Sequence, residues 1–218
     1  MKSLLPESRE LYNVIFSDKQ KLQIQGILNE INTNLDNYST KSLWEMDKEI
    51  GGIGGYCMPC DPIKNPFPGG EYRTLFRPLQ YARSEIDITG VYLHSKYVIL
   101  NSGLHLEAVV RLALRKYKFL GRIRYMNSTL GNATKSLSKV EDIPTELINH
   151  LFKFVKIYNK SKHEVNQNEG RKRLFMPSDA IVGYLAARII GYRLLQLIEH
   201  DSVRVEYRID ESKFNGLF

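Results

Sequence analysis

Cysteine is scarce in this sequence, and its most apolar segment is interrupted by charge. Two cysteines among 218 residues are too few for the disulfide framework of a small secreted protein. No secretory signal peptide is recognised, because residues 1–6 lead directly into polar residues. The apolar run at residues 180–198 contains Arg188 and Arg193, which argues against insertion into a membrane. We therefore expect a cytoplasmic protein without a membrane segment.

Acidic residues are absent from residues 108–140, which hold eight lysines and arginines. Through residue 90, ten Lys and Arg stand against twelve Asp and Glu, a balance of −2. From residue 91 onward, 21 stand against 12, a balance of +9, which accounts for the net charge of +7. This asymmetry favours a polyanionic partner such as RNA. The alternative is that the acidic half balances the basic half within the fold.

The stretch GGIGGYCMPCDP places Cys57 and Cys60 among glycines and a proline. A closed zinc site needs four ligands, and the nearest histidines, His94 and His105, lie more than thirty residues further along the chain. A redox pair needs a preceding strand and a following helix, but both flanks are rich in Gly and Pro. We interpret residues 51–70 as a crossing between two parts of the chain, with a zinc site or a redox pair as the alternatives.

Apolar residues recur with helical spacing along most of the chain, whereas strand signals are weak. The pattern predicts an all-α protein, an up-and-down helical bundle with an extra N-terminal helical layer and little or no β structure. Helices are expected within residues 8–38 with a break near Ser17, and within residues 40–50, 72–83, 89–121, 144–164 and 180–200. The segment TLGNATKSL is interpreted as part of a polar connection, and SVRVEYRID as a short strand or an ordered extension.

Asn159 and His163 are four residues apart near the end of a predicted helix, so both belong to one helical face. Lys156, Lys160 and Lys162 surround them, and these cations attract phosphates and depress the pKa of a nearby histidine. We take His163, Asn159 and Lys160 as catalytic candidates, with the histidine as general acid or base on a ribose 2′-hydroxyl. The alternative is an exposed histidine at a frayed helix end.

A second basic group steps at four, three and four residues along another predicted helix, which makes a stripe on one side of it. The candidate nucleic-acid-binding residues are Arg111, Arg115, Lys118 and Arg122 from this stripe, with Lys156, Lys162, Arg171 and Arg173.

Two other constellations are weighed beside these. Arg193 and His200 are seven residues apart and could share a face. The other is Glu107 with His105 and Arg111. Glu107 and Arg111 are four residues apart and are expected to form only an intrahelical ion pair. Glu107 and Tyr158 are also candidates to orient a catalytic group.

Four segments of the second half are similar to the HEPN superfamily, the higher eukaryote and prokaryote nucleotide-binding domain. They are NSGLHLEAVVRLAL, TLGNATKSL, FKFVKIYNKSKHE and DAIVGYLAARIIGY, and the similarity covers about residues 88–200. It lies in the pattern and not in one diagnostic motif. The resemblance implies a small helical bundle that forms a homodimer. It divides the chain into an N-terminal helical segment, residues 1–85, and a HEPN-like bundle with a short C-terminal extension, residues 86–218.

The resemblance also implies an activity. Many members are metal-independent ribonucleases of toxin–antitoxin or phage-defence systems, and others are inactive binding or scaffold modules. Active members carry an arginine, a polar residue and, a few positions later, a histidine. Asn159 and His163 match the last two, and Lys156 or Lys160 stands where the arginine would be, without its bidentate fork.

The function that follows from the resemblance is binding of RNA or a nucleotide, with metal-independent cleavage in a dimer. Neither a metal nor another cofactor is expected, and an antitoxin-like protein is a candidate partner. The alternative is a non-catalytic dimeric interaction or scaffold protein.

Overall fold

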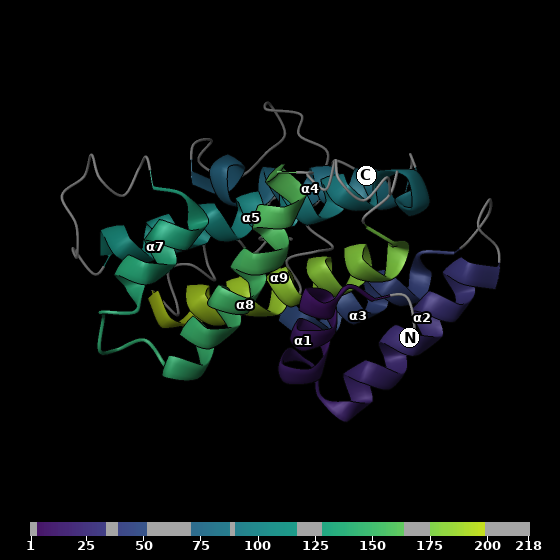
Figure 1. The fold of residues 1–218 in the computed structure, drawn as a ribbon, viewed down its shortest axis with the longest axis horizontal. Coiled ribbons are helices and arrows are strands. Elements are labelled where there is room, and N and C mark those ends of the chain that lie inside the picture. The colour runs from purple at the N-terminus through teal and green to yellow at the C-terminus, as the bar shows by residue number, and fades with distance from the viewer. Residues whose placement is uncertain are drawn as a thin grey trace, which may run out of the picture.

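The computed structural model describes residues 4–33, 39–51, 71–87, 90–116, 128–163 and 175–198, and the regular elements in these ranges are α-helices (Figure 1). They are α1 (Pro6–Ile15), α2 (Asp18–Thr33), α3 (Lys41–Gly51), α4 (Glu71–Asp87), α5 (Val91–Lys116), α7 (Leu130–Leu137), α8 (Thr145–His163) and α9 (Pro177–Ile198). The predicted all-α bundle with an N-terminal helical layer is confirmed.

The break between α1 and α2 is encoded locally. The Ser17 hydroxyl accepts a hydrogen bond from the Gln20 backbone N–H at 3.3 Å, and the Ser17 N–H donates to the Gln20 side-chain oxygen at 3.0 Å. This reciprocal pair is a capping box, which satisfies two donors at the start of α2. The predicted break near Ser17 is therefore confirmed.

Helix α9 lies at the centre of the bundle and packs against α1, α2, α3, α5 and α8. Residues 180–190 are buried without exception, so this part of α9 is covered on all sides. Leu93–Arg115 and Pro177–Leu197 are long and apolar enough to cross a membrane, but most of both stretches is buried inside the bundle. Core helices of soluble proteins have the same character, so the stretches are weak evidence for a membrane segment.

Arg188 of α9 and Asp47 of α3 form an ion pair inside this core. The guanidinium Nε donates to the Asp47 carboxylate at 2.5 Å, and both residues have an exposed fraction of 0%. A buried charge is tolerated only when it is paired, because desolvation costs several kcal/mol for each ion. The pair therefore fixes how α3 docks on the central helix.

Helices α4 and α5 form an antiparallel hairpin, and Gly90 in its turn adopts a φ of 86°, a conformation that favours glycine. The His105 Nδ1 lies 2.7 Å from the Leu75 carbonyl, so this nitrogen must donate. Burial lowers the pKa of His105 to about 3, and the histidine is neutral. The domain boundary predicted near residue 85 falls in the last turns of α4 and stays a prediction.

Helix α8 crosses α5 at Gly103, where a glycine is required by the packing. A Cβ at this position would lie 2.0 Å from the Cδ2 atom of Tyr158, a fully buried side chain of α8. The segment TLGNATKSL, which we expected to be part of a polar connection, instead contains α7. Its Leu130, Ala133 and Leu137 are buried, and α7 packs on both α5 and α8.

The Arg188–Asp47 pair leads to a first prediction. We expect Asp47→Leu to lower the free energy of unfolding by about 3–5 kcal/mol, because it leaves the buried guanidinium without its carboxylate. The double variant Asp47→Leu/Arg188→Met should lose less than the single variant, as measured by urea unfolding. If the loss of stability in the double variant equals the sum of the losses in Asp47→Leu and Arg188→Met, the two residues are not coupled.

The crossing of α5 and α8 leads to a second prediction. Gly103→Ala should lower the free energy of unfolding by about 1–3 kcal/mol, because the added Cβ overlaps the ring of Tyr158, which is fully buried. Gly26→Ala in α2 is the matched control, since no atom lies within 4 Å of its added Cβ, and it should gain about 0.5–1 kcal/mol. Thermal unfolding of both variants measures the difference.

Candidate functional site

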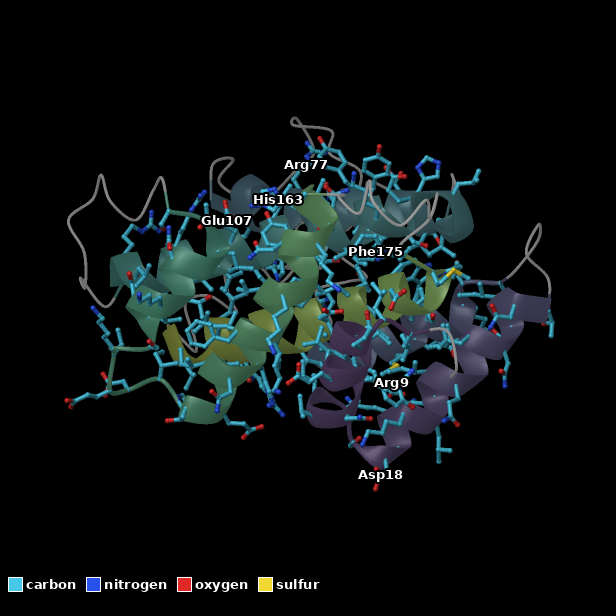
Figure 2. The ribbon with its side chains drawn as sticks, viewed as in Figure 1. Arg9, Asp18, Arg77, Glu107, His163 and Phe175 are labelled. Carbon is cyan, nitrogen blue, oxygen red and sulfur yellow. The ribbon has the colours of Figure 1, made fainter. Side chains whose placement is uncertain are left out.

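The last two turns of α8 carry the predicted catalytic residues. Asn159 and His163 are exposed and lie one turn apart on the same face of the helix. Figure 2 labels His163. Among the described residues, neither side chain has a hydrogen-bond or ion-pair partner. Lys160, Lys162 and His163 form the last turn of the helix, where cations interact favourably with the helix dipole. Both candidates are thus available to a ligand.

The lysines of α8 are paired with glutamates of α1. Lys160 contacts Glu7 at 2.7 Å and Lys156 contacts Glu10 at 3.2 Å, while Lys153 also binds Glu10. Burial is the largest single influence on the pKa of Glu7 and raises it, but the hydrogen bonds to Glu7 and the positive charges of Lys160 and Lys156 together outweigh burial, so the net shift is downward. Hydrogen bonds from Lys153 and Lys156 lower the pKa of Glu10. Lys156 and Lys160 therefore help to seat α1.

Glu107 is the centre of a second charged cluster. Its carboxylate accepts hydrogen bonds from Arg111 Nη2 at 2.6 Å and from the Leu130 backbone N–H at 3.0 Å, and Lys162 Nζ lies 3.5 Å away. Arg111 also donates to the Ser128 carbonyl through Nε at 3.0 Å and Nη2 at 2.6 Å. The cluster, Glu107 with Arg111, Lys162 and Leu130, joins α5, the start of α7 and the end of α8.

Tyr158 lies under this cluster and belongs to the core. Burial is the main reason that its pKa is raised, and the negative charge of Glu107 acts in the same direction. Lys162 Nζ lies 4.1 Å from the centre of the Tyr158 ring, a cation–π contact. Arg111 was expected to form a simple ion pair with Glu107. In the structure, Lys162 and the Leu130 N–H also contact Glu107, and Arg111 also donates to the Ser128 carbonyl. His105 is turned away into the core.

The remaining predicted residues are placed as follows. Arg115 is exposed on α5. Arg193 is exposed and lies 3.5 Å from Glu146. The following predicted features lie outside the described residues: Lys118, Arg122, Arg171, Arg173, His200, Cys57 and Cys60, nearly all of the crossing at residues 51–70, and the segment SVRVEYRID. Within the described ranges, no group of three or more His, Cys, Asp or Glu side chains could hold a metal ion.

Two features of the site were missed by the sequence reasoning. The glutamates of α1 lie more than 140 residues from the lysines that they pair with, so no local spacing indicates the contact. The sequence contains only one sign of the buried pair of Arg188 and Asp47, namely an arginine inside an apolar run. Such an arginine signals a buried partner but does not identify it.

A comparison with protein-family models, with curated proteins and with solved structures finds no match to this chain. Any functional assignment therefore rests on the residues themselves.

The Glu107 cluster leads to a third prediction. Glu107→Gln keeps the size of the side chain but removes the charge that Arg111 and Lys162 share, and we expect a loss of about 1–3 kcal/mol in the free energy of unfolding. Glu45→Gln in α3 is the control, because Glu45 is an exposed partner of the exposed Lys41 at 3.9 Å and should change stability by less than about 0.5 kcal/mol. Equal losses in chemical unfolding would contradict a structural role for the cluster.

Proposed function

We propose that this chain is an RNA-binding helical protein with an acid–base site for metal-independent cleavage at the end of α8. The observation that carries the proposal is the exposure of Asn159 and His163 on one face, without partners among the described residues. An imidazole that is open to solvent can exchange protons with a bound substrate. The net charge of +9 from residue 91 onward supports a polyanionic substrate.

The chemistry requires no metal ion. His163 would accept the proton of a ribose 2′-hydroxyl, and the 2′ oxygen would attack the adjacent phosphorus. The bond from phosphorus to the 5′ oxygen breaks, and the leaving oxygen takes a proton from water. The Asn159 amide, one turn away, can donate a hydrogen bond to a phosphate oxygen and so stabilise the charge that develops there. Because Lys156 and Lys160 pair with α1, other cations must supply most of the phosphate contacts.

A non-catalytic dimeric interaction protein is the second candidate. The pairing of the α8 lysines within the chain favours it, because those lysines are then neutralised without a ligand. Exposed apolar side chains such as Leu22 and Phe152 also provide surface for protein contacts. The two candidates differ in how the chain responds to single-stranded RNA.

Binding of a labelled single-stranded RNA separates the two candidates. For an RNA-binding protein, the logarithm of the affinity falls linearly with the logarithm of salt concentration, with a slope of about −0.7 for each phosphate contacted. Fluorescence anisotropy between low and physiological salt measures this slope. A folded protein that shows no binding at low salt would leave the interaction protein as the function.

Cleavage is tested with a mixed pool of single-stranded RNA in the presence of EDTA. We expect the wild type to cut the pool, His163→Ala to lose cleavage, and Asn159→Ala to retain only a small part of it. Asn149→Ala is the matched control, because Asn149 is an exposed asparagine near the other end of α8. Cleavage that survives in His163→Ala would exclude this histidine as the acid–base group.

A further inference from the structure

The outer face of the α4–α5 hairpin carries exposed tyrosines. Tyr81 on α4 is 54% exposed and Tyr97 on α5 is 47% exposed. His94 Nδ1 lies 2.9 Å from a Glu85 carboxylate oxygen, which pins the two helices together near the turn. Tyr81 is one turn before Glu85 and Tyr97 is one turn after His94, so in the antiparallel hairpin both tyrosines lie one turn further from the connection than this contact, at about the same level.

Each of these rings has a basic side chain beside it. The Arg77 Cζ lies 5.9 Å from the centre of the Tyr81 ring, and Lys96 Nζ lies 5.8 Å from the centre of the Tyr97 ring. The His94 ring is also 5.9 Å from that of Tyr97. We call Arg77, Tyr81, His94, Lys96 and Tyr97 the tyrosine face. It combines aromatic rings with positive charge.

The nearby carboxylates of the hairpin are already engaged. Glu85 pairs with His94, and Asp87 accepts a hydrogen bond from the Trp44 indole at 2.9 Å. Among the described residues, Arg77 forms no ion pair with a carboxylate. Arg77 therefore offers positive charge to an anionic ligand, next to the flat ring of Tyr81.

The tyrosine face extends towards the end of α8. The bond from His105 to the Leu75 carbonyl sets the register of the hairpin, and it places Arg77 opposite the part of α5 that α8 crosses at Gly103. Lys162, next to His163, reaches Glu107 one turn further along α5. Figure 2 shows Arg77 and His163 at the same side of the bundle. A strand lying along the face would run towards Asn159 and His163.

We propose that the tyrosine face binds single-stranded RNA, with bases stacked on Tyr81 and Tyr97 and phosphates held by Arg77 and Lys96. This inference rests on the proposed function and names the surface that recognises the substrate. Single-stranded nucleic acids are bound by aromatic side chains that stack on bases, next to cations that follow the backbone. The centre of a protein interface is instead depleted of lysine, whereas Lys96 adjoins the Tyr97 ring of this face.

The test uses three substitutions at one ring, measured as the dissociation constant for a labelled single-stranded RNA. Tyr97→Phe keeps the stacking surface and should bind within about twofold of the wild type. Tyr97→Ala should bind about tenfold more weakly, and Tyr97→Leu, which keeps apolar bulk without a ring, should also bind weakly. Leu22→Ala on α2, which is 69% exposed, is the control and should bind as the wild type does.

Charge is tested separately with Arg77→Gln. Loss of one phosphate contact should reduce the slope of log affinity against log salt by about 0.7. An unchanged slope would show that Arg77 contacts no phosphate of the bound RNA.

The outcomes distinguish the tyrosine face from the proposed function. If the wild type binds RNA and Tyr97→Ala binds it equally well, the tyrosine face is not the RNA-binding surface, while the proposed RNA binding remains supported. If the folded wild type binds no RNA at low salt, the proposed function fails and this inference fails with it. If the wild type is dimeric and Tyr97→Ala is monomeric in light scattering, the face is a contact between two copies, which also overturns the inference.

Discussion

The ion pair between Arg188 and Asp47 is the constraint on which the rest of the bundle depends. A guanidinium at the centre of α9 is stable only with a carboxylate beside it, and α3 delivers that carboxylate to the core. Trp44 of α3 also packs against Tyr184 of α9 with the two rings nearly perpendicular, and the Arg83 Cζ of α4 lies 4.1 Å from the centre of the Trp44 ring. The ion pair and the Trp44 contacts thus connect α3 to both α9 and α4.

Charge is distributed across the fold so that the two halves of the chain partly neutralise each other. The acidic residues of α1 lie on the lysines of α8, and this explains part of the opposite charge balance of the two halves. Lys156 and Lys160 are consequently not the best source of phosphate contacts beside His163. The hairpin of α4 and α5 holds cations that lie next to aromatic rings instead, so its surface differs in chemical character from that of α8.

Helices of many turns were predictable from sequence, because their apolar residues repeat with the helical period, and the break at Ser17 was predictable from its turn chemistry. Helix α7 was missed because Gly131, Asn132 and Thr134 favour other structures, although Leu130 and Leu137 keep the helical spacing. The site was only partly predictable. Asn159 and His163 share an exposed face, as their spacing predicts, but the partners of Lys156 and Lys160 depend on helices that meet only after folding.

Asp179 carries a consequence for the order of events during synthesis. One of its carboxylate oxygens accepts the Leu5 N–H at 2.9 Å, ahead of α1, and the other accepts the Met176 N–H at 2.9 Å, ahead of α9. The carboxyl is buried, and burial raises its pKa. Since the two N–H groups are far apart along the chain, α1 leaves the ribosome long before its docking site exists. The apolar face of α1 therefore has no docking site until α9 has been synthesised, and chaperones can bind that face during the interval.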